Sequence, residues 1–485
     1  MDAGTDFGGH HRDHAATTTA VNVNHADCEP EFLGLTLSCT LVNKVVLGTS
    51  HPQSDALLSS LQRAESVKKH GLLKMAILFF LLASFSLPAA DLPQNELSKD
   101  FEKYHAKKNV VKPPKGLLKY EYLVPAGPYN HLFDWDMYFM GVALSYDGVG
   151  KPVASSVQCF LEFVDSNAGR TGYAPRELAP DAPWALPEMC KPFLAQAALR
   201  ASMTMNDFTW LARTNSQKKS NYAKLAETLQ FWEETRRSPD GLFRWYNGVE
   251  SGVDNNPAIS ENPAESTEGV DLQCYVYREY LALAALAGKL GETNEVILYN
   301  AKADGLRKLV QRRMWSEPDG MFLNIDAWTG KFIPIKSWTS FTPLWAGIAT
   351  PEQAQRTITS HLLNPGEFWA PCGIRTLAAD EPLYDPNHGY WRGPIWVVSN
   401  YQIMHGLMNY GFTKEARELA GKTVTLLAND YATTGGMNEC YTPDTGKPTA
   451  GGHFLSWNLL AEHMIEEAEK GTDPTAIPVR LETSR

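Results

Sequence analysis

Residues 270–290 read VDLQCYVYREYLALAALAGKL, and their periodicity predicts a long amphipathic helix. Apolar side chains recur at spacings of three and four, which places them on one helix face: Leu272, Val276, Tyr280, Leu283, Ala287 and Leu290. The capping residues Ser266 and Thr267, with Glu268 in the first turn, predict where the helix begins. Gly291 predicts where it ends. The stretch therefore favours a helical fold over a sheet.

The same pattern recurs on both sides of this stretch, from about residue 95 onward. Helix-length apolar patterns cover residues 130–148, 152–165, 188–207, 219–237, 294–314, 351–363, 394–410, 413–431 and 453–470. Alternation typical of β-strands is scarce, so a parallel α/β sheet is not expected. Residues 95–475 are therefore predicted to form one all-α domain.

Two similar turns suggest an internal repeat. RRSPDGLFRW (236–245) and RMWSEPDGMFLN (313–324) each follow a predicted helix and place Pro-Asp-Gly in a turn. Proline sets φ for such a turn and glycine supplies positive φ. Because a long polar loop follows each turn, the pattern indicates an α/α toroid of paired helices with the long loops at one rim. A non-repetitive helical domain with two coincidentally similar turns is the alternative.

Residues 1–90 are expected to be a poorly structured N-terminal extension. The uncharged run 75–90 is shorter than the roughly 20 residues of a membrane span, so no stable span is expected. It has the length of a signal-peptide core. Either Met75 is the true start and the run directs secretion, or the run belongs to the extension of a cytoplasmic protein. His10 and His14 have metal-like spacing without an acidic or Cys partner nearby, which favours a solvated tail.

The composition is that of a folded, acidic protein. The 485 residues include 44 Lys and Arg and 55 Asp and Glu, a formal charge of −11, and 44% are hydrophobic. These values exclude a disordered or collagen-like chain. The acidic balance, without a long Lys/Arg run, argues against nucleic acid as a partner. The seven cysteines form no CxxC pair, which supports neither a disulfide framework nor a zinc ribbon, so we expect no metal and no cofactor.

Three loops contain the residues best suited to chemistry. Residues 248–257, GVESGVDNNP, hold Asp254 among Gly, Asn and Pro, although an Asx-turn alone would explain this acid. Residues 390–396, YWRGPIW, bring two Trp and one Tyr to the start of a predicted helix, where they either pack in the core or line a sugar pocket. Residues 435–453 contain Glu439 and are too long and Gly-rich for a mere connector.

Two carboxylates on separate loops at one rim are what glycoside hydrolysis requires. One stays protonated and gives its proton to the leaving oxygen, and the other is ionised and activates water. Other chemistries find less support. Lys151 is followed by Pro152 rather than Ser or Thr, so the preceding glycines form no P-loop, and no GxSxG elbow appears.

The region from about Pro125 to Glu467 resembles glycoside hydrolase family 63 and, more distantly, the trehalases. The resemblance rests on five motifs in order: HLFDWD (131–136), ESGVDNNP (250–257), YWRGPIW (390–396), the Glu439 loop and GGHFLSWN (451–458). It implies an (α/α)6 barrel and an inverting mechanism. By position, Asp254 resembles the family's general acid and Glu439 its general base.

The compact form, with the barrel starting soon after the extension, most resembles the mannosylglycerate and glucosylglycerate hydrolases. These cleave an α-linked hexose from D-glycerate, a charged compatible solute. The resemblance implies that the following residues contact substrate or wall the sugar site: Tyr129, Phe133, Asp134, Trp135, Asp136, Gly252, Tyr390, Trp391 and Trp396.

The glycerate carboxylate needs a cationic or polar partner. On resemblance, Arg278 and Gln196 rank first, ahead of Arg176 and Lys191. Two departures affect the walls of the pocket. Many relatives have Trp where this chain has Val249, and many have Gln-Pro where it has Lys191 followed by proline.

Together the motifs predict an inverting α-glycosidase that acts on a small charged glycoside. A trehalase-like enzyme or α-glucosidase acting on a neutral disaccharide is the alternative of the same class. A non-catalytic carbohydrate-binding toroid is the alternative of another class, although the presence of both Asp254 and Glu439 argues against it. The preference between mannose and glucose, and the oligomeric state, do not follow from these motifs.

Overall fold

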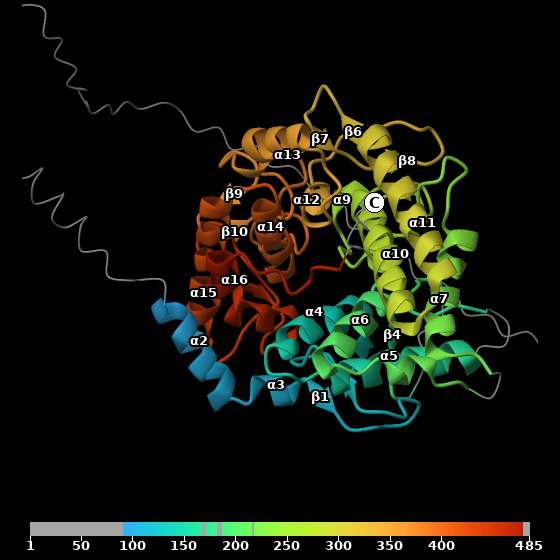
Figure 1. The fold of residues 1–485 in the computed structure, drawn as a ribbon. Coiled ribbons are helices and arrows are strands. Elements are labelled where there is room, and N and C mark those ends of the chain that lie inside the picture. Colours follow the sequence, from blue (N-terminus) through green and yellow to red (C-terminus); the bar gives the residue numbers. More distant parts are fainter. Residues whose placement is uncertain (1–90, 167–170, 182–186, 216–217, 479–485) are drawn as a thin grey trace, which may run out of the picture. The chain divides into compact units, whose positions relative to one another are not determined.

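Helices arranged in two concentric rings form the body of the chain (Figure 1). The computed structural model describes residues 91–166, 171–181, 187–215 and 218–478. The inner ring consists of α4 (Asp134–Ser145), α6 (Leu194–Met205), α10 (Val270–Leu290), α12 (Thr342–Trp345), α14 (Val397–Asn409) and η4 (Ser456–Glu462), which α16 (Met464–Lys470) continues. Each inner element packs against the next, and η4 packs against α4. The inner ring is therefore closed.

The outer ring covers these elements. It consists of α2 (Asp91–Lys103), α5 (Lys151–Ser166), α7 (Asn221–Thr235), α11 (Thr293–Arg313), α13 (Pro351–Thr357) and α15 (Thr413–Thr434). The rings of Phe101 in α2 and of Tyr104, the residue after α2, lie against Tyr431 in α15, at centroid distances of 6.0 and 5.6 Å. This contact joins the first described helix to α15, and the predicted (α/α)6 barrel is confirmed.

The remaining elements are short and lie in the connections. The helical ones are α3 (Ala106–Asn109), η1 (Thr209–Ala212), α8 (Gly248–Ser251), α9 (Pro257–Ser260), η2 (Trp338–Phe341) and the π-helix η3 (Ile358–Leu362). The strands pair as β1 (Val111–Lys112) with β2 (Tyr122–Leu123), β3 (Leu132–Phe133) with β4 (Glu177–Leu178), β5 (Thr267–Glu268) with β8 (Ile325–Asp326), β6 (Trp315–Ser316) with β7 (Met321–Phe322), β9 (Trp369–Ala370) with β10 (Gly373–Ile374) and β11 (Cys440–Tyr441) with β12 (Pro448–Ala450). All these pairs are antiparallel.

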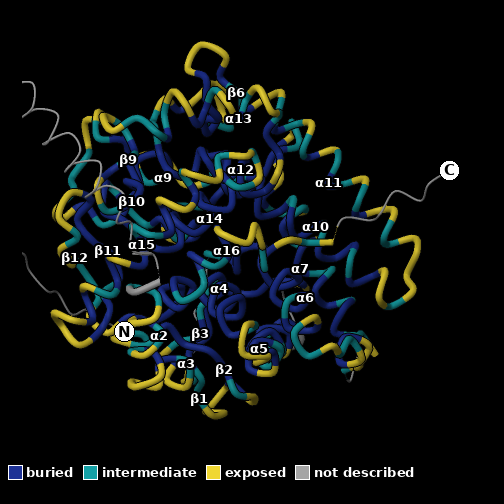
Figure 2. The backbone as a smooth tube through the Cα atoms, turned by 60° about the vertical axis from the view of Figure 1, so that its left-hand side comes forward, coloured by how far each residue is buried: buried dark blue, intermediate teal, exposed yellow. Residues whose placement is uncertain are grey.

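Burial follows the two rings (Figure 2). Every residue of the inner helix α4 except Ser145 is buried. In the outer helix α11, the buried residues are Tyr299, Ala303, Leu306 and Val310, which share one face. Burying apolar surface contributes about 25 cal/mol per Å². The inner elements therefore hold most of the hydrophobic core, and the outer helices supply one apolar face each.

The helix that the sequence pattern predicted most strongly forms as expected, but its cap differs. Helix α10 spans Val270–Leu290, and Gly291 follows in the left-handed region at φ 82°. The predicted caps Ser266 and Thr267 are wrong, because Gly269 occupies the N-cap position. Thr267 is instead part of β5, which pairs with β8.

The helix predicted to begin at Pro394 begins later, at Val397. Ile395 donates its backbone N–H to the Tyr441 carbonyl at 2.7 Å and accepts from the Tyr441 N–H at 3.1 Å. This bridge keeps the chain extended before α14. It also ties the YWRGPIW loop to the strand that follows Glu439.

The two Pro-Asp-Gly turns both follow an outer helix, but the hydrogen bond that closes the second turn spans one more residue. In the first, Gly241 N–H donates to the Ser238 carbonyl at 2.9 Å, directly after α7. In the second, Gly320 N–H donates to the Ser316 carbonyl at 2.8 Å, after α11. Each turn therefore closes a short hairpin at the end of an outer helix.

Residues 471–478 follow α16 and pack against three inner helices. Thr475 is buried; its carbonyl accepts a hydrogen bond from Arg278 of α10, and its hydroxyl accepts one from Trp345 Nε1 of α12 at 3.0 Å. Asp473 Oδ1 lies 3.6 Å from His405 Nδ1 of α14. Arg278 stands eight residues into α10, roughly 12 Å along the helix from its first residue. The segment therefore joins α10, α12 and α14 well away from the loops that precede them.

The predicted extension, residues 1–90, lies outside the described residues, and with it the run 75–90 and the pair His10 and His14. Among the helices that the structure describes, none combines the length and apolar character needed to cross a membrane.

Candidate active site

The loops that precede the inner helices enclose a pocket that collects most of the predicted residues. It is lined by Pro125, Tyr129, Phe133, Asp134, Trp135, Asp136, Arg176, Lys191, Gly252, Asp254, Tyr390, Trp391, Trp396, Glu439, Phe454 and Trp457. Of the predicted site residues, only Gln196 and Arg278 do not line it. Segments far apart in the sequence thus meet at one rim of the barrel, as the toroid predicted.

The first carboxylate of the FDWD stretch organises the floor of the pocket. Asp134 is fully buried, and its oxygens accept hydrogen bonds from the Lys191 N–H at 2.7 Å and from Lys191 Nζ at 3.1 Å. The Lys191 ammonium also lies 5.2 Å from the centre of the Trp135 ring. Because its charge is paired inside the protein, Asp134 is suited to positioning rather than to proton transfer.

The second carboxylate of this stretch has a different environment. Asp136 is buried and accepts a hydrogen bond from the Ser456 hydroxyl at 2.6 Å. Burial raises the pKa of Asp136 to about 7; the Ser456 hydrogen bond opposes the rise, and the negative charges of Asp134 and Glu439 add to it. Near neutral pH its carboxyl can therefore either donate or accept a hydrogen bond with a bound hydroxyl group.

Asp254 lies in the turn between α8 and α9. The preceding Gly252 has φ 81°, and a Cβ there would meet Lys191 Cε at 2.8 Å and Trp135 Cζ2 at 2.9 Å. Only glycine fits this approach, which brings the acid loop against the pocket floor. Among the described residues, no side chain donates a hydrogen bond to the half-buried Asp254 carboxyl.

Glu439 lies just before β11 and is held from two sides. The hydroxyls of Tyr129 and Tyr390 both donate to its Oε1, at 2.9 and 3.0 Å. No described residue donates to its other oxygen, Oε2. Glu439 is buried, with only 5% of its surface exposed. It therefore keeps one fixed oxygen and one oxygen available to a bound molecule.

Their surroundings distinguish the two carboxyl groups. Burial raises the pKa of Asp254, and the positive charges of Arg176 and Lys191 oppose the rise. Burial also raises the pKa of Glu439; the two tyrosine hydrogen bonds oppose this, and the charge of Asp254 adds to it. Hydrogen bonds to a carboxylate favour its ionised form. Glu439 is therefore the better base of the pair, and Asp254 the better holder of a proton.

Aromatic rings form the wall of the pocket. Trp391 and Trp396 stack in parallel at 3.8 Å, and Tyr390 meets Trp396 edge to face at 4.8 Å. Trp457 packs against Trp135 at 5.2 Å. Flat apolar faces of this kind exclude water around a bound sugar ring.

Some lining residues were not predicted as contacts. Phe454 and Trp457 lie within the GGHFLSWN motif, whose aromatic residues were the available signal. Arg176 and Lys191, ranked behind Arg278 for the glycerate, are the cations among the described residues that line the pocket. Lys191 is paired with Asp134 at 3.1 Å. Arg176 lies 3.5 Å from Glu177 and keeps a fifth of its side chain exposed.

Arg278 and Gln196 have other partners, so the structure does not bring them to the pocket. Arg278 Nε donates to Gln196 Oε1 at 3.1 Å, and the guanidinium lies 3.9 Å from the Trp345 ring centre. The same guanidinium donates to the Thr475 carbonyl. Their expected contact with glycerate is therefore corrected: Gln196 accepts a hydrogen bond from Arg278, and Arg278 binds residues 471–478. Val249 is exposed and also lies outside the pocket lining.

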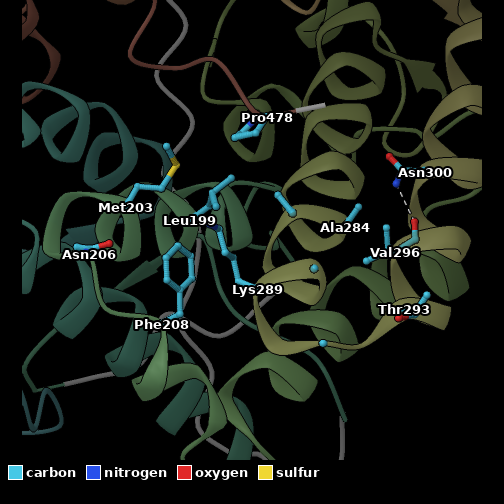
Figure 3. A pocket seen from close by; sticks show the side chains of 13 residues that line it. Leu199, Met203, Asn206, Phe208, Ala284, Lys289, Thr293, Val296, Asn300 and Pro478 are labelled. Carbon is cyan, nitrogen blue, oxygen red and sulfur yellow. Dashed lines mark hydrogen bonds between the residues drawn. The ribbon is translucent and has the colours of Figure 1, made fainter. Parts of the chain in front are cut away.

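A second cavity, of about 650 Å³, lies between α6, α10 and α11 (Figure 3). Leu199, Met203 and Phe208 form one side, and Lys289 is its charged residue. None of the described residues lining it is acidic, so it offers no acid–base pair. Within the described ranges, no group of three His, Cys, Asp or Glu side chains is placed to hold a metal ion.

Comparisons with known proteins were made with this geometry in hand. Residues 161–457, more than half of the chain, match the family model described as the mannosylglycerate hydrolase MGH1-like glycoside hydrolase domain. A probable mannosyl-oligosaccharide glucosidase of Schizosaccharomyces pombe is 25% identical over 49% of this chain and 32% of its own length. Mannosylglycerate hydrolase MGH1 of Selaginella moellendorffii is 29% identical over 37% of this chain and 34% of its own length. The matches thus span about a third of these curated relatives.

A solved structure agrees with the fold. The crystal structure of GH63 mannosylglycerate hydrolase from Thermus thermophilus in complex with glucose matches with a TM-score of 0.57 and 20% identity. The match covers 75% of this chain and 99% of that chain. The helical rings described above therefore recur in a complete solved chain.

Proposed function

Since the chain belongs to the mannosylglycerate hydrolase MGH1-like glycoside hydrolase family, we propose that it hydrolyses an α-hexoside of D-glycerate, mannosylglycerate or glucosylglycerate, with inversion. The predicted membership of glycoside hydrolase family 63 agrees with this assignment. The observation that carries the proposal is the pocket itself, where Asp254 and Glu439 reach one aromatic-walled space beside Arg176.

In the proposed reaction, Asp254 is the general acid and Glu439 the general base. The oxygen of a water molecule forms a bond to the anomeric carbon while one of its protons passes to Glu439. The bond from that carbon to the glycosidic oxygen breaks, and the Asp254 proton goes to this leaving oxygen. Inversion needs the carboxyl groups roughly 6.5–9.5 Å apart, so that the water fits between the base and the sugar.

The contacts of the two groups support these roles. Tyr129 and Tyr390 stabilise ionised Glu439 through Oε1, which leaves Oε2 for the water. Asp254 lacks such donors among the described side chains and its pKa is raised by burial, so it retains a proton more readily. General acid–base catalysis of this kind contributes about 10²- to 10⁴-fold to a rate.

The proposal is tested by incubating the wild-type protein with mannosylglycerate, glucosylglycerate and trehalose and analysing the products. Release of hexose and D-glycerate is expected, with the β-anomer appearing first in an NMR time course. A neutral disaccharide is the alternative substrate that the motifs left open, and one relative is named as a glucosidase rather than as a mannosylglycerate hydrolase. Cleavage of trehalose alone would replace the glycerate assignment, and an initial α-anomer would contradict inversion.

Arg176→Ala is expected to weaken selection for the substrate carboxylate. Arg176 is the pocket cation that keeps exposed surface, whereas Lys191 is buried against Asp134. A charge-assisted hydrogen bond contributes about 1.5–3 kcal/mol. Wild-type kcat/KM should thus be about ten- to a hundredfold higher for the carboxylate substrate than for its amide, and Arg176→Ala should bring the ratio close to one.

Arg176→Lys should retain part of this preference. Arg356→Ala serves as the matched control, because Arg356 is an exposed residue whose partner is Glu317 on the surface. Kinetics with the carboxylate and amide substrates provide the measurement. An unchanged ratio in Arg176→Ala would assign the carboxylate to another residue.

Tyr390→Phe is expected to move the acidic limb of the kcat/KM profile to higher pH. The Tyr390 hydroxyl donates to Glu439 and lowers the pKa of that carboxyl. Removing the donor raises the pKa, so Glu439 becomes the ionised base only at higher pH. The comparison is a pH–rate profile beside Tyr410→Phe, whose hydroxyl donates to the distant Ala349 carbonyl. An acidic limb that stays in place would separate Glu439 from the base role.

A further inference from the structure

The side chain of Asn255, the residue after Asp254, bonds to both sides of Tyr390. Its Nδ2 donates to the Gly389 carbonyl at 2.9 Å, and its Oδ1 accepts from the Trp391 N–H at 3.0 Å. One amide group thus makes both hydrogen bonds that an opposing strand would make with this backbone. The acid loop and the YWRGPIW loop are joined at this point.

Tyr390 is the residue whose hydroxyl holds Glu439, at 3.0 Å from Oε1. Its φ is +58°, a left-handed conformation that a bulky residue adopts only when its surroundings impose it. The Trp396 Nε1 donor fixes its carbonyl at 3.0 Å. Asn255 is therefore linked to the base in two steps. Its amide bonds to the backbone on both sides of Tyr390, and the Tyr390 hydroxyl bonds to Glu439.

We propose that Asn255 is a positioning residue that sets the separation of Asp254 and Glu439. This inference rests on the proposed function of the two carboxyl groups. The space for the attacking water depends on that separation, and a misplacement of about 1 Å can lower a rate about 10²-fold. Because Asn255 is covalently next to Asp254 and brackets Tyr390, a shift of the acid loop relative to the base requires these bonds to break.

An asparagine amide meets both requirements of this position. The contact needs a donor toward Gly389 and an acceptor toward Trp391. An aspartate keeps the acceptor toward Trp391 but places an oxygen against the Gly389 carbonyl. An alanine offers neither the donor nor the acceptor. The neighbouring Asn256 attaches the loop separately, through Nδ2 to the Trp391 carbonyl at 3.1 Å and to the Thr376 carbonyl at 3.3 Å. Loss of the Asn255 amide therefore loosens the acid without detaching the loop.

The test compares two leaving groups in Asn255→Ala. For the glycoside that the wild type cleaves, kcat should fall about ten- to a hundredfold, with KM changed less than about threefold. For the α-fluoride of the same hexose, the loss should be only a few-fold, because fluoride is a weak base and departs without full protonation by Asp254. A general loss of folding would reduce both rates equally.

Asn255→Asp, which is nearly isosteric, should show the same bias toward the fluoride. Asn262→Ala is the matched control, since the partners of its amide in the described part of the chain are the nearby Ala258 and Ile259 carbonyls and it does not line the pocket; it should match the wild type on both substrates. Thermal melts report folding of each variant. If both Asn255 variants keep the wild-type kcat, or lose activity equally on the two substrates, this inference is overturned and the proposed function stands. If the wild-type protein itself cleaves none of the glycosides and none of the fluorides, the proposed function is overturned and this inference with it.

Discussion

Asp254→Asn is expected to lower kcat for the glycoside substrate by about 10²- to 10⁴-fold, the contribution of a positioned proton donor. The amide is similar in size to the carboxyl but has no proton to give to the leaving oxygen. No described side chain donates to the Asp254 carboxyl, so the exchange should not disturb the loop. Steady-state kinetics with product detection measure the loss, and calorimetric titration should show that the ligand still binds.

Asp304→Asn provides the control, because Asp304 is a partly exposed acid on the outer helix α11. It should retain wild-type kcat. Turnover that survives Asp254→Asn within about threefold would remove Asp254 from the acid role, since the expected contribution is far larger. Ligand binding without any wild-type turnover would instead favour the non-catalytic toroid.

Glu467→Ala should cause the largest loss of stability, about 3–5 kcal/mol in the free energy of unfolding. Glu467 is 1% exposed and accepts hydrogen bonds from His405 Nε2 at 3.0 Å and from the Tyr146 hydroxyl at 2.5 Å. Burial lowers the pKa of His405, but the charges of Asp473 and Glu467 outweigh it and raise the pKa overall. Removing Glu467 leaves the fully buried His405 without this acceptor.

Urea unfolding of Glu467→Ala beside Glu466→Ala gives the comparison. Glu466 is the adjacent residue on the same helix, but its side chain is 40% exposed and pairs with the surface Lys470. Its replacement should change the free energy of unfolding by less than about 1 kcal/mol, as is usual for exposed ion pairs. Equal effects of the two substitutions would show that the Glu467 contacts add little to stability.

Local patterns in the sequence were sufficient for most of the barrel. The bounds of α10 follow from apolar spacing and a terminal glycine, because one helix face must be buried whatever its neighbours are. Most of the pocket residues were named from the resemblance to glycoside hydrolase family 63, because the aromatic and Gly-rich loops by themselves fitted a packed core or a surface turn equally well. Asp254 and Glu439 are 185 positions apart. They could be assigned to one site only because paired helices return each long loop to the same rim.

The errors arose where a partner lies far away in the sequence. Pro394 suits a helix start, but the bridge from Ile395 to Tyr441 holds the chain extended instead. Arg278 suits a substrate carboxylate by its charge, yet its guanidinium is used by the Thr475 carbonyl, 197 residues later. Charge and helix propensity are properties of one residue, whereas the contacts of Ile395 and Arg278 depend on which distant segment packs against each of them in the folded chain.

The link between Arg278 and residues 471–478 has a consequence for biosynthesis. A ribosome makes α10, α12 and α14 before it makes Thr475, so the nascent barrel carries a buried guanidinium and the Trp345 indole without their final partners. Contacts across such long sequence separations form late, and incomplete cores expose apolar surface meanwhile. Chaperone dependence of this chain should therefore be greatest while residues 471–478, which join α10, α12 and α14, are still inside the ribosomal exit tunnel.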